Sequence, residues 1–343
     1  MKTRFYILLT IAVFSNMALY GTVWRISNIS GADAHFTSVQ DAIYSNNVNS
    51  SDTLYIEPSP VSYGDAALHK TLFLIGNGFF LDENPEPPIN KNSSVMGHIS
   101  FDAGSEGSVI TGCTISSITI NSSVPDITIK RNLINGKIII NATNDISILS
   151  NFIKGSVYST YISIPMIYAT HADIYNLLIS GNYIENESRD LSIDIGSSSS
   201  EHARNAIIEN NVIGNGVTIR NSSFYNNILC YGDFIETDSD YTNNIGNSEQ
   251  FGTENGNQQN INMLDVFVGE YADEVSTDGM WQLKEGSPAI GAGTGETDCG
   301  MFDGMHPYTL SGIPDIPSIF EYQQVYNHQT QEVEVTISIK SNN

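Results

Sequence analysis

Short apolar strands separated by polar turns recur through the middle of this 343-residue chain. In "DITIKRN" (126–132), Ile127 and Ile129 point to one side of an extended backbone, and Thr128 and Lys130 point to the other. This period of two residues predicts β-strands rather than helices. Ile, Val and Thr dominate the strands, while Gly and Asn separate them, as expected for short strands joined by tight turns.

A six-residue pattern links these strands. "IKRNLI" (129–134), "ILSNFI" (148–153), "ISGNYI" (179–184) and "IENNVI" (208–213) each place Asn three residues after an apolar residue and Ile two residues after the Asn. The aligned position is occupied by Cys113, Asn132, Asn151, Asn182, Asn211, Asn227 and Asn244. The residues three before and two after it are nearly all apolar, although the spacing between repeats varies. Strands of fixed register joined by loops of variable length would give this pattern.

The repeat predicts an all-β fold, a right-handed parallel β-helix, in which each repeat stacks one strand on the last at about 4.8 Å. Asn tolerates the left-handed backbone conformation of a tight bend, so we expect the Asn column at the bend between two sheets. Stacked Asn side chains can hydrogen-bond along such a column. Cys113 would fill the same position as a small, buriable residue. This ladder is therefore predicted to be architectural.

The flanking segments predict caps. Thr37 and Gln40 have the spacing of a capping box, and Val39, Ala42 and Ile43 after them share one helical face. A short helix here would cover the first rung. We therefore divide the chain into a signal peptide (1–21), a parallel β-helix with its N-terminal cap (22–246), and a less regular C-terminal capping segment and tail (247–343). Residues 155–173 and 185–206 are interpreted as insertions.

The leader and the charge restrict location and partners. Residues 1–21 have a basic start and an apolar run too short to span a bilayer, which is typical of a secretory signal peptide, and no later segment is long and apolar enough for a transmembrane helix. Removing Lys2 and Arg4 with the leader changes the net charge from −24 to −26. Such a surface repels nucleic acid, anionic lipid and polyuronate chains. We expect a secreted, extracellular or cell-surface protein, with the periplasm as the alternative, and no nucleic-acid partner.

Both ends of the chain resemble a known group of proteins. "GADAHFTSVQDAI…DTLYIEPSPVSYGDAALHKTLFLIGNG" is similar to the N-terminal segment of secreted bacterial right-handed β-helix proteins of the pectate-lyase-like superfamily. "EGSPAIGAG" (285–293), "DCGMFDG" (298–304) and "HPYTLSGIPDIPSIFEY" (306–322) resemble the closing segment of an uncharacterised subgroup of them. The resemblance implies the fold and export. It does not imply one activity, because that superfamily holds lyases, hydrolases, epimerases and adhesins.

Two functions remain open: a non-catalytic protein that binds polysaccharide or another cell-surface component through its loops, and a carbohydrate-active enzyme such as a polysaccharide lyase, glycoside hydrolase or epimerase. A catalytic site on this fold would need stacked carboxylates on neighbouring rungs. The positions two and four residues before the Asn column stack no two carboxylates. This favours the non-catalytic interpretation, and the catalytic residues, if any exist, are not predicted.

Three groups of residues are candidates for binding or cross-linking. Tyr158, Tyr161 and Tyr168 crowd the first insertion and could stack on sugar rings. Cys230 and Cys299 could form a disulfide after export, or remain as thiols. A stretch of hard oxygen ligands could bind Ca²⁺, although it matches no Ca²⁺-loop pattern and no other cofactor is evident. Its members are Asp233, Glu236, Asp238 and Asp240.

Overall fold

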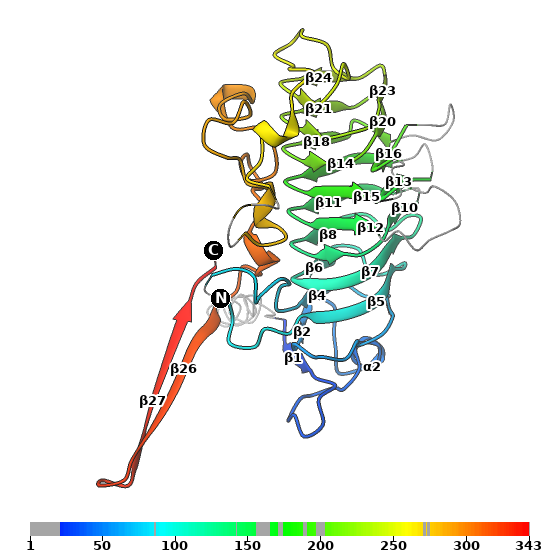
Figure 1. Cartoon of the computed structure of the whole chain (residues 1–343). Helices are drawn as coiled ribbons and strands as arrows, with labels where there is room; N and C mark the ends of the chain where they lie inside the picture. The colour runs from blue at the N-terminus through cyan, green and yellow to red at the C-terminus, as the bar shows by residue number, and fades with distance from the viewer. Residues whose placement is uncertain are drawn as a thin grey trace, which may run out of the picture.

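A computed structural model describes residues 21–85, 87–141, 143–155, 165–170, 174–187, 191–196, 203–269, 272 and 275–342. The predicted signal peptide lies outside the described residues except for Gly21. Two long parallel sheets take strands in alternation along the chain and stack them as rungs of a solenoid (Figure 1). The predicted all-β parallel β-helix is therefore confirmed.

The first sheet has 11 strands, and every pair in it is parallel. Its members are β1 (Val23–Ile26), β2 (Asp52–Ile56), β4 (Leu72–Ile75), β6 (Val109–Thr111), β8 (Ile127–Lys130), β11 (Asn144–Leu149), β14 (Ile174–Ser180), β17 (Ala203–Arg204), β18 (Ile207–Glu209), β21 (Ser223–Tyr225) and β24 (Asp240–Thr242).

The second sheet has 14 strands. Its members are β3 (Ala66–Leu68), β5 (Ser94–Phe101), β7 (Cys113–Ile120), β9 (Leu133–Ile134), β10 (Ile138–Ile140), β12 (Phe152–Gly155), β13 (Ile167–Ala169), β15 (Tyr183–Asn186), β16 (Ile193–Asp194), β19 (Val212–Ile213), β20 (Val217–Arg220), β22 (Ile228–Leu229), β23 (Phe234–Thr237) and β25 (Ile245–Gly246). It divides at β7, whose first residues pair with β9 and whose last residues pair with β10. The two resulting branches form two walls of the solenoid, and the first sheet forms the third.

The core lies inside the three walls and consists of stacked aliphatic side chains. Ile110, Ile129, Ile148, Ile179 and Ile208 are partners in register on consecutive strands and are fully buried. This confirms the apolar column three residues before the Asn position. Because the repeat places one Ile directly above another, burial and strand pairing reinforce each other at every rung.

The Asn ladder is present and extends further than predicted. Each ladder Asn accepts, through Oδ1, the backbone N–H of the ladder residue in the preceding rung, from Cys113 to Asn132 (3.1 Å) through to Asn227 and Asn244 (3.0 Å). It ends at Asn257, whose Oδ1 accepts from the backbone of Asn244 at 2.9 Å. All of these side chains are buried.

One prediction about the ladder is wrong. The left-handed conformation belongs to the residue before each ladder Asn rather than to the Asn itself. The residues with positive φ are Gly112, Arg131, Ser150, Gly181, Asn210, Asn226 and Asn243. The ladder Asn must keep its side chain inside the bend to hydrogen-bond, so the preceding residue makes the turn.

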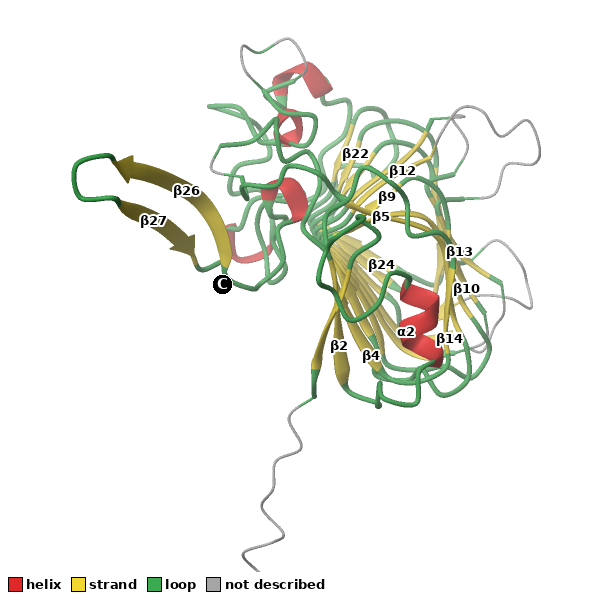
Figure 2. Cartoon of the chain, turned by 90° about the horizontal axis from the view of Figure 1, so that it is seen from below, coloured by secondary structure: helices red, strands yellow, loops and turns green. Residues whose placement is uncertain are grey.

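The N-terminal cap is confirmed with one correction. Helix α2 (Val39–Tyr44) lies under the first rungs (Figure 2) and buries Val39, Ala42 and Ile43. Its N-cap is Ser38, which accepts from the N–H of Asp41, so the capping box at Thr37 and Gln40 is wrong. The Gln40 amide instead pairs with both backbone groups of Ala67 on β3, because a strand edge offers it two hydrogen bonds at once.

The C-terminal part does more than cap the last rung. Phe251 closes the end of the core against Phe224 and Phe234. The described residues between 261 and 317, called the lateral segment here, then run back along the side of the stack (Figure 1) with short 3-10 helices. These helices are η1 (Met263–Asp265), η2 (Gly279–Trp281), η3 (Thr294–Glu296) and η4 (Leu310–Gly312). An antiparallel hairpin of β26 (Ser318–Asn327) and β27 (Glu332–Lys340) projects beyond the body. Among the described residues, no helix is long and apolar enough to cross a membrane.

Candidate functional site

The lateral segment follows the column of left-handed residues in reverse order. Asn243 Nδ2 donates to the carbonyl of Ala292 at 3.0 Å, and Asn226 Oδ1 accepts from the N–H of Thr294 at 2.9 Å. Further down, Ser150 Oγ donates to the carbonyl of His306 at 3.1 Å. Arg131 donates to the carbonyl of Ile313 at 2.9 Å and pairs with Asp315. The left-handed residues therefore do two things: they turn the chain between the sheets, and they hydrogen-bond to the lateral segment.

A second hydrophobic cluster lies beneath the lateral segment. From Asn132 to Asn244, the residue after each ladder Asn points away from the solenoid core and is nevertheless apolar. These residues are Leu133, Phe152, Tyr183, Val212, Ile228 and Ile245. They pack against the underside of the segment, where Phe267, Cys299, Met301 and Tyr308 are buried. The sequence carried this signal in "NLI", "NFI", "NYI" and "NVI", because two successive apolar residues on a strand require cover on both faces.

A groove of about 570 Å³ opens where the lateral segment meets the wall formed by β12 and β15. Lys154, Glu185 and Cys230 from the stack lie on one side of it. The other side is mostly apolar and comes from the turn after β22 and from the lateral segment. The residues there are Tyr231, Met263, Leu264, Phe267, Val268, Gly269, Ala272, Met280 and Trp281. A pocket of this size with few polar groups is typical of small-ligand sites.

The polar side of the groove contains the ammonium group of Lys154 and the carboxylate of Glu185, and Lys154 also pairs with Glu187, which does not line the groove. Lys154 and Glu185 are partners in register on β12 and β15, and their side chains lie 3.3 Å apart, Nζ to Oε2. Nζ of Lys154 also lies 3.2 Å from Oε1 of Glu187. Burial alone would lower the pKa of Lys154, but the two carboxylates outweigh it and raise that pKa above its ordinary value. Lys154 therefore remains protonated at neutral pH, where it faces two carboxyl groups.

Gly214 keeps the space above Glu185 open. It follows Ile213 on the next rung, at the position that corresponds to Glu185. A Cβ at this glycine would lie 2.8 Å from Cγ and 2.9 Å from Cβ of Glu185. Any side chain here would press on the carboxylate, so the glycine leaves Glu185 room at the groove.

Aromatic rings define the apolar side. Tyr183 packs on Phe152 at a ring distance of 4.5 Å and on Trp281 at 4.4 Å, which fixes the indole beside the groove. The Tyr183 hydroxyl donates to Oε2 of Glu185 at 2.8 Å. Its pKa is raised by burial and by that carboxylate, so it remains a donor. Tyr231 also lines the groove and is 59% exposed. One exposed and one anchored aromatic ring thus flank an oriented carboxylate.

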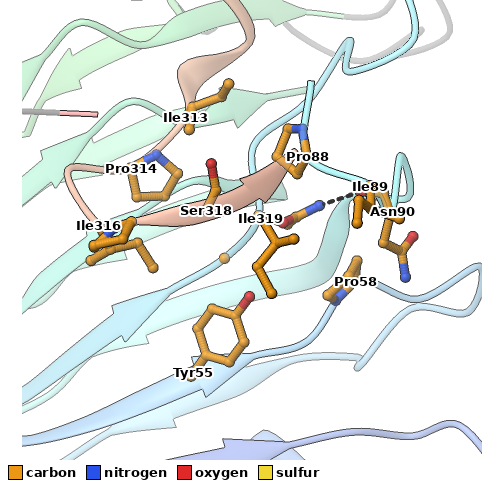
Figure 3. A pocket seen from close by; sticks show the side chains of 13 residues that line it. Tyr55, Pro58, Pro88, Ile89, Asn90, Ile313, Pro314, Ile316, Ser318 and Ile319 are labelled. Atoms are coloured by element: carbon orange, nitrogen blue, oxygen red, sulfur yellow. Dashed lines mark hydrogen bonds between the residues drawn. The ribbon is translucent and has the colours of Figure 1, made fainter. Parts of the chain in front are cut away.

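A second pocket, of about 360 Å³, lies at the base of the hairpin (Figure 3). Tyr55, Pro88, Ile89, Pro314 and Ile319 line it, together with other Pro and Ile side chains. Among the described residues that line it there is no carboxylate or amine, and the polar side chains are those of Tyr, Asn and Ser. This pocket therefore offers an apolar contact surface rather than groups for acid–base catalysis.

The predicted acidic stretch does not converge. Asp233 precedes β23, and Asp238, in a left-handed conformation, falls between β23 and Asp240 on β24. The turn at Asp238 breaks the extended chain that would have placed it on the face of Asp240. Within the part of the chain that is described, no three His, Cys, Asp or Glu side chains are grouped to hold a metal ion. Ca²⁺ binding at Asp233, Glu236, Asp238 and Asp240 stays a prediction.

The predicted tyrosine cluster is only partly placed. Tyr158 and Tyr161 lie outside the described residues. Tyr168 is half-buried on β13, in register with Ile139 and Asp194, on a different wall from the groove. The groove aromatics, Tyr231 and Trp281, were missed because they flank the repeat rather than belong to it.

The cysteines are all unpaired thiols. Cys113 occupies the first ladder position and is fully buried, which raises its pKa to about 12. Cys230 and Cys299 are both in the second hydrophobic cluster and do not form the disulfide considered from the sequence.

Comparisons of the chain with protein-family models, with curated proteins and with solved structures found no match.

Proposed function

We propose that this chain is a secreted or cell-surface β-helix protein that binds a glycan, without cleaving it, in the groove between β12, β15 and the lateral segment. The observation that carries the proposal is the combination of Tyr231 and Trp281 with the Lys154–Glu185 pair around one groove. Flat aromatic rings suit the C–H faces of sugars, and paired charged groups accept and donate to hydroxyls. The leader and the resemblance to secreted bacterial β-helix proteins support this location.

The expected ligand is a neutral glycan. The chain carries a net charge of −24 before removal of its leader. At the groove, the ammonium group of Lys154 is paired with the carboxylate of Glu185 and with that of Glu187 beside it. A polyuronate would have to overcome this repulsion, whereas a neutral sugar would not. Affinity should change little with salt concentration, because stacking and short hydrogen bonds are screened less than long-range charge attraction.

The test is a glycan array on residues 22–343, followed by titration calorimetry with the best neutral oligosaccharide. We expect Tyr231→Ala and Glu185→Gln each to weaken binding about tenfold, the loss of roughly 1.4 kcal/mol of contact. Tyr44→Ala is the matched control, because Tyr44 is 65% exposed on α2 at the far end of the stack. Binding that survives both groove substitutions would place the site elsewhere, including the tyrosine-rich insertion at Tyr158, Tyr161 and Tyr168.

A second candidate function is catalysis on carbohydrate, as a glycoside hydrolase, lyase or epimerase. It is favoured by one observation: the Lys154 ammonium lines the groove and pairs with two carboxylates, those of Glu185 in the groove and of Glu187 next to it. Acid–base chemistry on a sugar needs such groups within reach of one bond. Turnover of a bound glycan, lost in Glu185→Gln and in Glu187→Gln while binding is retained in one of them, would replace the non-catalytic proposal. If no bound glycan gives a product, the non-catalytic proposal is supported.

A further inference from the structure

The C-terminal hairpin is an amphipathic ribbon whose apolar face, beyond its base, is left about half exposed by the described residues. Its base is fixed to the body, because the N–H of Ile89 donates to the carbonyl of Ile319 at 3.0 Å and Asn342 Nδ2 donates to the carbonyl of Ile316 at 2.7 Å. Beyond that base, β26 and β27 extend away from the solenoid (Figures 1 and 2). A two-stranded ribbon alone is marginally stable in water, so a partner that buries its apolar face would stabilise it.

The register divides the ribbon into two chemically different faces. One face pairs Ile319 with Ile339, Tyr322 with Ile337, Gln324 with Val335, and Tyr326 with Val333. The opposite face pairs Glu321 with Ser338, Gln323 with Thr336, Val325 with Glu334, and Asn327 with Glu332. Within this fully described hairpin, all three glutamates therefore lie on the second face.

The apolar face is continuous with the pocket at the base of the ribbon. Ile319 belongs to that face and also lines the pocket, where its side chain lies beside Tyr55 and the Pro88–Ile89 loop (Figure 3). One strip of apolar surface thus runs from a hollow at the base to a tyrosine at the tip. A hollow and a projecting ring at opposite ends of the same strip are complementary to each other under a two-fold rotation.

We propose that the apolar face of the hairpin is a homodimer interface, in which two copies of the chain pack their ribbons face to face and antiparallel. The tip of each ribbon, with Tyr326 and Val333, then lies over the pocket at the base of the other. This arrangement fills both pockets with aromatic rings by a single symmetric contact, and needs no other partner.

Charge favours a second copy as the occupant. An acidic chain repels its own copies, so self-association requires a surface from which the acidic groups are excluded. The apolar face meets that requirement, because Glu321, Glu332 and Glu334 point away from it and would remain in solvent on the outside of the pair. A basic partner protein would instead use the acidic face.

The area agrees with a reversible dimer. Seven large side chains on the apolar face are between 46% and 64% exposed, namely Ile319, Tyr322, Tyr326, Val333, Val335, Ile337 and Ile339. At somewhat less than 100 Å² each, they would bury roughly 600 Å² per copy, or about 1,200 Å² in total. That value is at the lower limit for specific interfaces, so the dimer should dissociate on dilution.

The experiment is sedimentation velocity of residues 22–343 over a wide range of concentration. We expect a monomer–dimer equilibrium that shifts to monomer in Tyr326→Ser/Val333→Ser, with at least a tenfold weaker dimer. Val325→Ser is the matched control, since Val325 is 58% exposed on the opposite face of the same strand. It should leave the equilibrium unchanged. Circular dichroism of each variant checks that the solenoid is intact.

A cross-linking variant tests the antiparallel arrangement. Tyr326→Cys/Ile89→Cys places one thiol at the tip and one beside the pocket, and should give a disulfide-linked dimer under mild oxidation. A monomer at every concentration would overturn the proposal. So would a dimer that is unaffected by Tyr326→Ser/Val333→Ser, or one that Val325→Ser weakens equally.

Discussion

Asn182 Oδ1 accepts two hydrogen bonds from Asn151, which lies 31 residues earlier in the chain: one from the backbone N–H at 2.8 Å and one from the side-chain amide at 3.0 Å. The Asn182 amide donates in turn to the carbonyls of Ile148 and Ser180. One side chain thus satisfies buried groups in two rungs that an insertion separates.

Replacing Asn182 with Ala should destabilise the fold. The substitution leaves the buried backbone N–H of Asn151 without its acceptor and removes the amide donor from the carbonyls of Ile148 and Ser180, of which Ser180 keeps the hydrogen bond from the N–H of Ser150. A buried unsatisfied group costs about 1–3 kcal/mol, so we expect a total loss of about 3 kcal/mol. Urea unfolding followed by circular dichroism measures it. Asn46→Ala is the control, because Asn46 is exposed in the loop after α2. Equal effects of the two changes would contradict an essential ladder.

Gly214→Ala should disturb the groove more than the fold. The new Cβ would overlap Cγ of Glu185 at 2.8 Å, so that side chain has to move. Overpacking of this kind costs about 1–3 kcal/mol. If the groove binds glycan, affinity should fall along with this modest loss of stability. Calorimetric titration and thermal melting of the same variant measure both, and unchanged values in both would show that the space above Glu185 has no importance.

The native thiols should resist alkylation. Burial raises the pKa of Cys113 and of Cys299 to about 12, with a smaller contribution from Asp298 at Cys299, and raises that of Cys230 as well. Little thiolate is therefore present at pH 8, and the thiolate is the reactive form. Mass spectrometry after iodoacetamide treatment should find three unmodified cysteines in the folded chain and three modified ones in urea. Rapid labelling of Cys230 alone would instead reveal opening of the lateral segment from the stack.

Acid should weaken the first rung through Asp52. Burial tends to raise the pKa of this carboxyl, but hydrogen bonds from Trp24 Nε1 and from the backbone of Asn49 and Thr22 outweigh it, and the pKa is lowered. A lowered pKa contributes stability that is present above the ordinary value of 3.8 and lost as pH falls through the folded-state pKa. Asp52→Asn should therefore melt at a lower temperature at pH 7, and the difference should shrink as the pH falls below 3.8. A difference that stays constant with pH would contradict this origin.

The local pattern of the chain was enough to predict the solenoid. A strand period of two residues and an apolar column that survives variable spacing leave few folds other than a parallel stack. Ile129, Ile148 and Ile179 follow one another in register as that pattern requires. Burial and backbone pairing are both periodic, so each repeat predicts the same buried positions and the same strand pairing.

The Asn ladder was predicted from the sequence only in part. Asn132 was predicted at the bend, but Arg131 has the left-handed backbone, with φ of 52°. The repeated Asn in the sequence shows that this residue type is needed at the position. It does not show whether Asn is needed for a left-handed backbone or for the hydrogen bonds of its side chain. The hydrogen bonds that decide this question join residues 13 to 31 positions apart.

The groove and the hairpin were decided by tertiary structure alone. Lys154 and Trp281 lie 127 positions apart in the sequence and line one groove only because the lateral segment returns along the stack. That return depends on many separate contacts between left-handed bends and an irregular chain, such as Asn243 with Ala292. These irregular contacts have no period, so no repeated pattern in the sequence predicts them. The solenoid could be predicted because each rung carries the same pattern of apolar residues and Asn.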